Sequence, residues 1–501
     1  MTLEEQRRIL RDRGICVIIP TYNNAGTVAD VTRRAMEQCD DVIVVCDGCT
    51  DDTLERLGAL ENSPVVIGLE SNRGKGAALR TGFRHALEAG FSYAVTLDGD
   101  GQHFPEDIPL MLKANQEHPG ALIVGERKNL SEAERSGGSK FANSFSNFWF
   151  AVQTWHYLRD TQTGFRLYPL KKLHLLSCLT SRYEAELELL VLASWHGVEL
   201  VSVPVNVYYP PKEERVSHFR PVRDFARISV LNIVLCAMSL VYGLPLRLFR
   251  WLMTIVRTVY SLLVFVLFTT ILATPLWYLY LHIGGVTEKK KLQLHHFIRN
   301  VARFVLKVHG IPGVRFTMDN PYGEDFSRPA VIICNHQSHL DLLPMLLQTD
   351  RLVVLTTDWV WKSPLYGYIV RNADFLPGSE GIEKLLPRFR ALAENGFSIA
   401  IYPEGTRSED CSIGRFHQGA FRIAQELGMD IVPMVLYGAG RALPKKSLIM
   451  RKWPIHVEID RRITAGELGE MGGTTLEQAS AMRRYYRRRY SEIADRIERD
   501  V

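Results

Sequence analysis

The chain has 501 residues, a formal net charge of +5 and 46% hydrophobic residues, so there is room for two cores of ordinary domain size together with membrane segments. Its eight cysteines are scattered, and Cys46 and Cys49 have no second pair with which to complete a zinc site, so we expect reduced, cytosolic thiols. The charged first thirteen residues argue against a cleavable signal peptide, and we find no repeat or low-complexity linker.

Short apolar strands that end in polar loops alternate with helical stretches in the first part of the chain. Residues 16–20 and 42–46 are predicted strands, and residues 29–38 between them are a predicted helix. This alternation is typical of a parallel α/β sheet that binds ligands at the carboxyl ends of its strands. Residues 72–78 then open a helix, where two glycines and Lys75 would favour an anion, although a tight turn has the same composition.

Two carboxylates one residue apart, Asp98 and Asp100, follow the predicted strand 93–97. Hard oxygen ligands at the end of a strand can bind a divalent cation, which in turn holds a diphosphate. An Asp-x-Asp triplet alone is more typical of a solvated turn, but the strands and the glycine-rich segment before it favour a nucleotide-sugar site.

In this order the four segments resemble the inverting family-2 glycosyltransferases, particularly the dolichyl- or polyprenyl-phosphate sugar synthases, over roughly residues 14–220. Further matches are Gly125–Arg127, Asp160–Leu167 and Glu184–Glu186. The resemblance implies an α/β fold of the GT-A, Rossmann-like kind. It also implies Mg²⁺ or Mn²⁺ held by Asp98, Asp100 and Gln102.

The same resemblance assigns further residues to the donor and the acceptor. The nucleotide-sugar would contact Pro20, Tyr22, Asp47, Lys75 and Asp98. The acceptor would contact Arg127, Arg166, Arg215 and Ser217, with Asp160 as the base. Two departures, Asn24 in place of an acidic residue and Cys46 in place of the first of two aspartates, leave the identity of the donor open.

The second half of the chain carries a different chemistry. A predicted strand at 331–334 is followed by His336 and Asp341. Five residues at about 100° each place these side chains well apart on an ideal helix, so they meet only if a turn or a helix start lies between them. A histidine oriented by a carboxylate is a general base for a hydroxyl, whereas the spacing alone is equally typical of ordinary loop residues.

A second apolar strand, 398–402, leads into Pro403–Ser408, and Ile431–Pro433 follows. These blocks resemble the 1-acylglycerol-3-phosphate acyltransferase family over roughly residues 250–490. The resemblance implies that His336 takes a proton from the acceptor hydroxyl and that Asp341 orients His336. It implies an acyl-CoA or acyl carrier protein donor, and an acceptor held by Glu404, Gly405 and Arg407. Residues 373–378 lack the arginine usual in the family, which leaves the acceptor open.

Two uncharged stretches, 229–246 and 258–287, lie between these parts. The longer one is predicted to be embedded in a membrane, and the shorter one to span it or to lie along its surface. Because both reactions use cytosolic donors, zero or two crossings are expected, and a two-pass hairpin would export Arg247, Arg250 and Arg257. We therefore favour a monotopic or re-entrant anchor in a bacterial cytoplasmic membrane, with both domains facing the cytoplasm.

Basic clusters flank this region at residues 215–227 and 289–291, and both favour contact with an anionic leaflet over a plain solvated face. The arginine- and tyrosine-rich segment 483–490 resembles an RNA-binding pattern, but no nucleic-acid fold accompanies it, so we predict no nucleic-acid partner.

We expect a glycosyltransferase domain at 1–225, membrane-associated helices at 226–290 and an acyltransferase domain with an α/β fold at 291–501. The favoured function is a bifunctional membrane enzyme that makes an acylated glycolipid from a nucleotide-sugar, an acyl-thioester and a lipid acceptor. The alternative is a polyprenyl-phosphate sugar synthase fused to a phospholipid acyltransferase that acts on a separate substrate. A third hypothesis, one domain degenerate and serving as a lipid-binding anchor, is disfavoured by the intact carboxylates and histidine.

Overall fold

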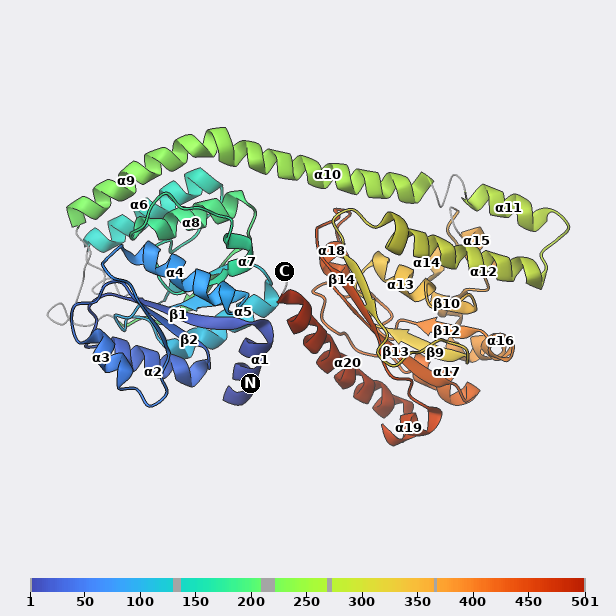
Figure 1. The fold of residues 1–501 in the computed structure, drawn as a ribbon. Helices are drawn as coiled ribbons and strands as arrows, with labels where there is room; N and C mark the ends of the chain where they lie inside the picture. The colour runs from blue at the N-terminus through green and yellow to red at the C-terminus, as the bar shows by residue number, and fades with distance from the viewer. Residues whose placement is uncertain (1, 129–136, 209–220, 268–272, 365–366, 500–501) are drawn as a thin grey trace. The chain divides into compact units, whose positions relative to one another are not determined.

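The computed structural model describes residues 2–128, 137–208, 221–267, 273–364 and 367–499. The chain divides into two compact units, Met1–Arg250 with Asp495–Val501, and Trp251–Ala494. Each unit contains one seven-stranded sheet with helices on its faces (Figure 1). The α/β fold class expected for both halves is therefore confirmed, whereas the borders of a separate middle segment at 226–290 stay a prediction.

The sheet of the first unit has the strand order β3-β2-β1-β4-β6-β5-β7. The strands are β1 (Ile15–Thr21), β2 (Val42–Cys46), β3 (Val65–Gly68), β4 (Tyr93–Thr96), β5 (Leu122–Arg127), β6 (Arg166–Pro169) and β7 (Leu200–Val205). The sheet is not wholly parallel as predicted, because β6 runs antiparallel to β4 and β5. Strand β6 begins opposite Thr96, at the carboxyl end of β4, so the chain enters it from the edge at which its neighbours end.

Helices cover both faces of this sheet, and each face has its own buried cluster. One face packs against α1 (Leu3–Arg13), α2 (Val28–Gln38), α3 (Thr53–Gly58) and α5 (Ile108–Glu117). The other packs against α4 (Lys75–Glu88), α6 (Gly137–Thr154), α8 (Glu184–Trp195) and α9 (Pro221–Met238). The short elements are η1 (Pro105–Asp107) and α7 (Leu170–Leu173). Helix α2 buries Val28, Val31 and Ala35, the spacing of one face of a helix.

The sheet of the second unit has the order β11-β10-β12-β9-β13-β14-β8, and only β14 is antiparallel to its neighbour β13 among the described pairings. The strands are β8 (Phe316–Asp319), β9 (Ala330–Cys334), β10 (Leu352–Thr356), β11 (Leu376–Pro377), β12 (Ser398–Ile401), β13 (Asp430–Tyr437) and β14 (Ile455–Ile459). Strands β9 and β12 match the predicted strands 331–334 and 398–402 to within one residue at each end, and the block Ile431–Pro433 lies within β13.

The helices of the second unit again lie on two faces (Figure 1). A buried cluster joins one face to α11 (Thr274–His282), α12 (Glu288–Arg303), α13 (Leu342–Leu346), α14 (Asp358–Trp361), α15 (Gly367–Asn372) and α18 (Ala439–Ala442). The other face carries α16 (Ile382–Glu394), α17 (Gly419–Leu427) and α20 (Thr475–Glu498). The remaining short elements are η5 (Phe304–His309), η6 (His339–Asp341), η7 (Gly378–Glu380) and α19 (Ala465–Glu470).

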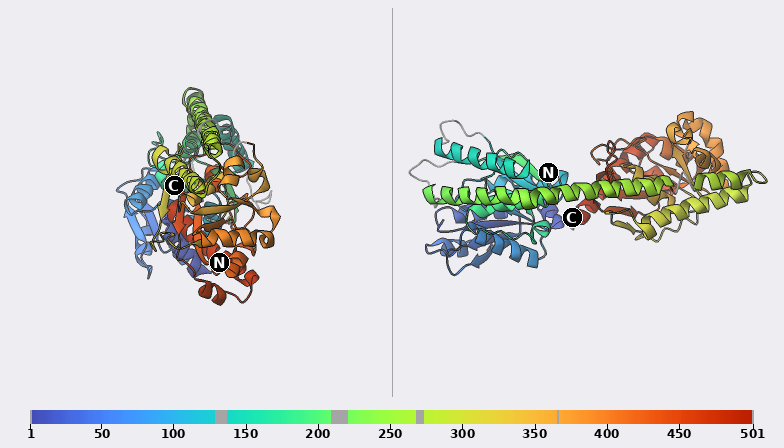
Figure 2. Two further views of the ribbon diagram at one scale, coloured as in Figure 1. Left: turned by 90° about the vertical axis from the view of Figure 1, so that its right-hand side faces the viewer. Right: turned by 90° about the horizontal axis from the view of Figure 1, so that it is seen from above.

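One long helix begins on the first unit. Helix α9, the π-helical turn η3 (Ser239–Gly243) and α10 (Leu244–Val266) are continuous, and the view from above in Figure 2 shows α9 along the outside of its unit. Phe225–Val266, 42 residues with a mean hydropathy of 1.9, is long and apolar enough to cross a membrane by length and composition. It contains the predicted stretch 229–246, whereas the stretch 258–287 includes residues outside the described part of the chain.

Candidate active sites

The first candidate site lies at the carboxyl ends of β1, β2 and β4. The order of the strands reverses between β1 and β4, and sheets of this class bind ligands in the crevice at such a point. Pro20 is buried within β1, and Tyr22 is half-buried just after it. The structure therefore places Pro20 and Tyr22, two of the predicted donor residues, at one edge of the sheet. This is expected because the strands run parallel there.

Asp47, at the end of β2, is buried and holds the glycine-rich segment. Its Oδ1 accepts a hydrogen bond from the backbone N–H of Arg73 at 2.8 Å, and its Oδ2 accepts one from Gly74 at 2.7 Å. The residue is only 3% exposed. Asp47 thus fixes the loop that starts helix α4, and its direct contact with a nucleotide stays a prediction.

Lys75 connects two carboxylates that come from different elements. Its Nζ lies 2.6 Å from Oδ1 of Asp98 and 2.8 Å from Oε2 of Glu186, in the first turn of α8. Burial alone would lower the pKa of Lys75, but the two carboxylates raise it above its usual value, so the lysine is charged. A Cβ on Gly164 would lie 2.2 Å from Oδ2 of Asp98, so only glycine leaves room for this arrangement.

The sequence identifies Glu186 only as part of a family match and assigns it no role. No spacing argument could connect it to Lys75, because the two residues lie on different helices far apart in the chain. Its Oε1 is buried without a hydrogen-bond partner among the described atoms, which makes Glu186 a further residue of this site.

Asp98, Asp100 and Gln102 have the chemistry of a divalent-cation site. Oδ1 of Asp100 accepts a hydrogen bond from the backbone N–H of Gln102 at 3.0 Å. Burial, and then the negative charge of Asp98, raise the pKa of Asp100 to about 6. The neighbouring His103 is buried with its Nδ1 unbonded among the described atoms. Two carboxylates and an amide oxygen fit Mg²⁺ or Mn²⁺, whose charge would relieve the repulsion between the carboxylates.

Asp160, the predicted base, forms a bidentate ion pair with Arg127 at the end of β5. Nε of Arg127 donates to Oδ2 of Asp160 at 2.5 Å, and Nη2 donates to Oδ1 at 2.9 Å. Asp160 is 3% exposed. Because both of its oxygens already accept a hydrogen bond, Asp160 also orients Arg127, and its role as base stays a prediction.

Arg166 is completely buried in the structure. The sequence places it beside the acceptor as an anion contact, and that contact stays a prediction. Its guanidinium donates to the carbonyl oxygens of Thr161, Thr163 and Glu186. Arg166 therefore holds the loop before β6 against α8. Two other predicted acceptor contacts, Arg215 and Ser217, lie outside the described residues.

The expectation of reduced thiols is wrong for one pair of cysteines. Cys46 and Cys49 form a disulfide, with their Cα atoms 5.8 Å apart. The turn between them has Gly48 at a φ of +69°, and it brings the two Cα atoms within the distance that a disulfide bridges. The other six cysteines, all within the described residues, are not part of a disulfide.

The second candidate site follows strand β9. Nδ1 of His336 lies 2.9 Å from Oδ2 of Asp341, and the same oxygen accepts hydrogen bonds from the backbone N–H groups of Gln337 and Ser338. Ser338 caps the helical turn η6, which ends at Asp341. The prediction that a helix start brings His336 to Asp341 is confirmed. The ring of His336 stacks on Tyr402, with ring centroids 4.1 Å apart.

Glu404 is buried beside this pair and connects two loops. Its Oε1 accepts a hydrogen bond from the backbone N–H of His336 at 2.8 Å, and its Oε2 accepts one from Gly414 at 2.7 Å. Burial raises the pKa of Glu404. Both oxygens are used within the protein, so Glu404 positions the backbone of His336, and a direct contact with the acceptor stays a prediction.

Arg407 brings positive charge close to His339. Burial, and then the charge of Arg407, lower the pKa of His339, which lies in the turn between His336 and Asp341. Gly405 is exposed in the same loop with a φ of +66°. Lys445, which the sequence does not single out, donates to the carbonyl oxygen of Arg407 at 2.8 Å. An anionic acceptor would meet two cations here.

The block that departs from the family pattern carries an ion pair. Asp374 lies in a left-handed turn, with a φ of +52°, just before β11. Its carboxylate lies 3.0 Å from Nζ of Lys291. The charge of Asp374 is therefore compensated within the protein.

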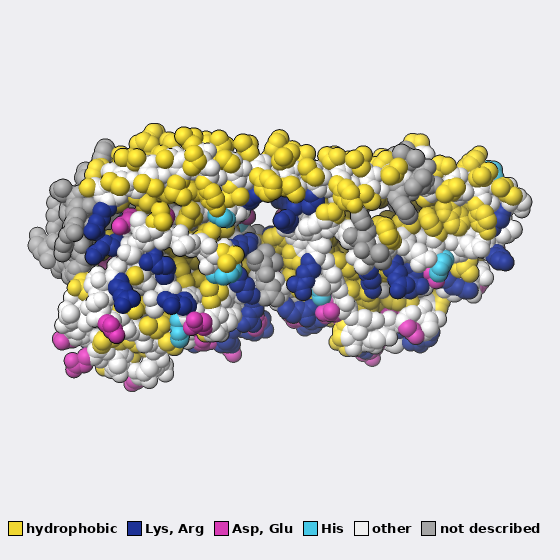
Figure 3. All heavy atoms as spheres, turned by 45° about the horizontal axis from the view of Figure 1, so that its top comes forward, with side chains coloured by type: hydrophobic (Ala, Val, Ile, Leu, Met, Phe, Trp, Pro, Cys, Tyr) yellow, Lys and Arg dark blue, Asp and Glu magenta, His cyan; other side chains and the backbone are white. Residues whose placement is uncertain are grey.

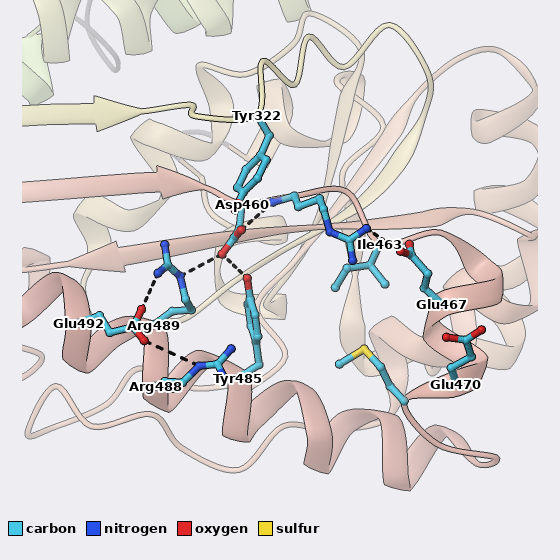
Figure 4. A pocket seen from close by; sticks show the side chains of 11 residues that line it. Tyr322, Asp460, Ile463, Glu467, Glu470, Tyr485, Arg488, Arg489 and Glu492 are labelled. Atoms are coloured by element: carbon cyan, nitrogen blue, oxygen red, sulfur yellow. Dashed lines mark hydrogen bonds and ion pairs between the residues drawn. The ribbon is translucent and has the colours of Figure 1, made fainter. Parts of the chain in front are cut away.

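A cavity of about 610 Å³ in the second unit contains none of the predicted site residues. Its lining includes Asp460, whose carboxylate accepts hydrogen bonds from Tyr485 and Arg489 (Figure 4). Nearby, ligand atoms of Asp319, His456 and Glu458 lie within 4.8 Å of one another. Glu458 of this cluster is ion-paired with Arg489.

Two families match separate parts of the chain. Residues 16–172 match Glycosyl transferase family 2, and residues 292–437 match the Acyltransferase family. The UDP-N-acetylglucosamine–dolichyl-phosphate N-acetylglucosaminyltransferase of Methanococcus voltae is 30% identical over 220 residues, which cover 40% of this chain and 88% of that protein. The 1-acyl-sn-glycerol-3-phosphate acyltransferase of Cocos nucifera is 35% identical over 144 residues, which cover 27% of this chain and 46% of that protein.

A solved structure, the 1-acyl-sn-glycerophosphate acyltransferase of Thermotoga maritima, is similar with a TM-score of 0.39 and 16% identity, over 49% of this chain and 98% of that one. The chain spans less than half of the length of the acyltransferase relative from Cocos nucifera, so that protein's activity does not transfer directly. The chain belongs to the family-2 glycosyltransferases and carries, in addition, a domain of the acyltransferase family. It is a transferase, and the resemblance inferred from the sequence is confirmed.

Proposed function

We propose that the protein is a bifunctional enzyme that transfers a sugar and an acyl chain to one lipid, making an acylated glycolipid. The observation that carries the proposal is the presence of two assembled polar centres in one chain. Lys75 and Asp98 form an ion pair at one sheet edge, where the charge of Asp98 also acts on Asp100, and His336 and Asp341 meet at another.

For the sugar transfer, an acceptor oxygen attacks the anomeric carbon of a nucleotide-sugar and the nucleoside diphosphate leaves, with inversion. A Mg²⁺ or Mn²⁺ ion held by Asp98, Asp100 and Gln102 would supply positive charge for the departing diphosphate. Lys75 adds a fixed cation beside Asp98. Asp160 would accept the proton of a hydroxyl acceptor, whereas a phosphate acceptor is already ionised and needs no base.

A lipid acceptor is supported by an apolar groove in the first unit. The groove, of about 660 Å³, is lined by Leu179 and by Val230, Leu231 and Val234 of α9. Glu184 also lines it, and this residue begins the helix that carries Glu186 to Lys75. The groove thus lies beside the first turn of α8, where a hydrocarbon chain could lie while its polar end enters the site.

For the acyl transfer, His336 takes the proton of an acceptor hydroxyl through Nε2, because Nδ1 faces Asp341. The hydroxyl oxygen then attacks the carbonyl of an acyl-thioester, an ester forms, and the thiol leaves with the proton from His336. Acyl-CoA and acyl carrier protein supply the same thioester. Arg407 and Lys445 would face a phosphate or another anionic group on the acceptor.

A second candidate function keeps the two substrates separate. The relative from Methanococcus voltae is named for a dolichyl-phosphate acceptor, and the relative from Cocos nucifera for a 1-acyl-sn-glycerol-3-phosphate acceptor. By this hypothesis the chain joins a polyprenyl-phosphate sugar synthase to a phospholipid acyltransferase. Under either function we place the enzyme at a bacterial cytoplasmic membrane, with both sites facing the cytoplasm.

Mass spectrometry of the lipids of a host with and without the protein tests the proposal. A single new lipid whose mass includes one sugar and one acyl chain supports the acylated glycolipid. A polyprenyl-phosphate sugar together with a separately acylated phospholipid would support the second function instead. The mass differences also identify the sugar class and the length of the acyl chain.

A further inference from the structure

The outer surface of the long helix Phe225–Val266 is apolar over its whole length. Large hydrophobic side chains cover it in the space-filling view (Figure 3). Four positions spread along the helix, Ile233, Val241, Trp251 and Leu263, are 71%, 79%, 63% and 62% exposed. The charged residues in this helix are four arginines, Arg227 among the lining of the groove and three further along.

Two of these three arginines are turned inward in the first unit. Nη1 of Arg247 donates to the carbonyl oxygen of Thr154, and Nη1 of Arg250 donates to that of Trp195, at 3.0 and 2.9 Å. These carbonyls lie at the C-terminal ends of α6 and α8, where a helix exposes unsatisfied acceptors and a negative dipole end. The positive charge of each arginine is therefore stabilised by the C-terminal end of a helix in the first unit.

The third arginine, Arg257, also donates to a backbone carbonyl, in this case within the second unit. Nε and Nη2 of Arg257 both donate to the carbonyl oxygen of Met450, at 3.2 and 2.6 Å. Gly313 lies against its side chain, because a Cβ there would be 3.1 Å from Cδ of Arg257. All three guanidinium groups thus donate to backbone oxygens. Arg247 and Arg250 stay partly exposed, and the other exposed positions of the helix carry apolar side chains or tyrosine.

This arrangement does not suit a helix that spans a bilayer. At about 1.5 Å per residue the 42 residues extend about 60 Å, twice the roughly 30 Å of the hydrocarbon layer. A crossing would also pull Arg247, Arg250 and Arg257 away from their carbonyls and into lipid, which strongly disfavours a charged side chain. A helix with one apolar surface and its charges on the other side fits the plane of the interface.

We propose that Phe225–Val266 is an in-plane membrane-docking helix, whose exposed surface is covered by the acyl chains of one leaflet. Lipid is the occupant that these features favour, because the helix is apolar enough for a bilayer and the apolar groove is lined by α9. The inference deepens the proposed function only in that it brings the first site to the surface where a lipid acceptor lies. Of the anchors that the sequence leaves open, the proposal selects a helix that lies in the plane of one leaflet.

The test measures the depth of single positions in vesicles. A small fluorescent amino acid is incorporated into the full-length protein at Ile233, Val241, Trp251 or Leu263, one at a time. Vesicles of phosphatidylethanolamine and phosphatidylglycerol carry bromine quenchers either close to the headgroup or near the end of the acyl chain. The same label at the exposed Glu37, on α2 at the opposite face of the first sheet, is the matched control.

We expect all four positions to be quenched most strongly by the shallow bromines, within about twofold of one another, and the label at Glu37 not to be quenched. A spanning helix would instead give depths that change along the four positions, with one of them quenched best by the deep bromines. That result, or the absence of quenching at all four, would overturn the proposal. Shielding of the labels in a lipid-free dimer, seen by sedimentation, would assign the surface to a second copy and would overturn it too.

The measurement needs neither sugar nor acyl donor, so its outcome is independent of catalysis. A protein that docks in the plane but makes no acylated glycolipid would contradict the proposed function alone. A protein that makes the glycolipid while the labels report a crossing would contradict the docking alone.

Discussion

Asp100 is the residue whose removal separates the two proposed reactions most cleanly. Burial and the charge of Asp98 raise the pKa of Asp100, and a bound cation would offset both effects. None of the described residues proposed for the second site contacts Asp100. We expect Asp100→Ala to lower sugar transfer by about two to three orders of magnitude, the usual effect of losing a preorganised charge at a leaving group. Acyl transfer should be unchanged.

Both reactions would be assayed on the purified variant with Mn²⁺ present. Asp52→Ala, which removes an exposed carboxylate just before α3, is the control and should leave both rates near normal. Near-normal sugar transfer by the Asp100 variant would refute the assignment of the cation site.

His336→Ala is expected to stop acylation and to leave glycosylation unchanged. A general base contributes about two to four orders of magnitude, so the acyl-transfer rate should fall by that amount. His339→Ala is the matched control, because this histidine lies in the same turn but Asp341 is bonded to His336. A lipid lighter by one acyl chain should accumulate in cells that carry the His336 variant. Continued acylation would require a different base.

Asp160 has two roles that can be told apart by experiment. As the base for a lipid alcohol, its replacement in Asp160→Asn should lower turnover by about two to four orders of magnitude. If it only orients Arg127, the loss should be matched by Arg127→Ala and be of similar size on every acceptor. Turnover would be compared on a lipid alcohol and on a polyprenyl phosphate, with donor binding measured separately. A loss of less than about tenfold would favour the phosphate acceptor and the second function.

The site residues that the sequence predicts share one feature of their position in the chain. Asp98, Asp100 and His336 directly follow apolar strands, and the carboxyl ends of parallel strands meet at one edge. The contacts that could not be predicted depend on tertiary placement. Lys75 meets Glu186 across two helices, and Arg166 carries the residue type of an anion contact but is used to tie a loop.

At the scale of the elements, Gly197 lies against Arg250 in the middle part of the docking helix. It follows α8 with a φ of +75°, and a Cβ there would lie 1.3 Å from Nη2 of Arg250. Gly90 follows α4 with a φ of +88° and has nothing within 4 Å of a Cβ. The two positions share the backbone strain, so a comparison between them isolates the contact with the arginine.

We therefore expect Gly197→Ala to destabilise the protein by about 2 kcal/mol more than Gly90→Ala, because a hydrogen bond from a charged group is also lost. Thermal unfolding of the two variants measures this difference. In an Arg250→Ala background the difference should largely disappear. Equal melting temperatures for the two single variants would show that Arg250 is not held as the structure places it.

Strands and their order were predictable to different degrees. Apolar runs with polar ends identify β1, β2, β4, β9 and β12 nearly to the residue, whereas the block Ile431–Pro433 covers only part of β13. The antiparallel β6 was not predictable, because its four residues carry no signal of direction, which is set by the loop before it. The disulfide of Cys46 and Cys49 was missed for a similar reason, since the turn geometry decides whether the sulfur atoms meet.

For the whole molecule, the two centres should respond differently to a chelator. Only the first site has a set of carboxylates suited to a divalent cation in its proposed mechanism, so EDTA should abolish sugar transfer and leave acyl transfer intact. Added Mn²⁺ or Mg²⁺ should restore the lost activity. The two rates would be followed in one preparation, and an equal loss of both would contradict the separation of the sites.

The central claim, that both sites act on one lipid, is tested most directly by mixing the two variants. Asp100→Ala retains the acyltransferase site, and His336→Ala retains the glycosyltransferase site. With a nucleotide-sugar, an acyl-thioester and a lipid extract, each variant alone should yield no lipid with both groups, whereas the mixture should yield the same acylated glycolipid as the wild-type protein. If mass spectrometry finds only singly modified lipids, both from the mixture and from the wild-type protein, the two domains act on separate substrates and the claim is wrong.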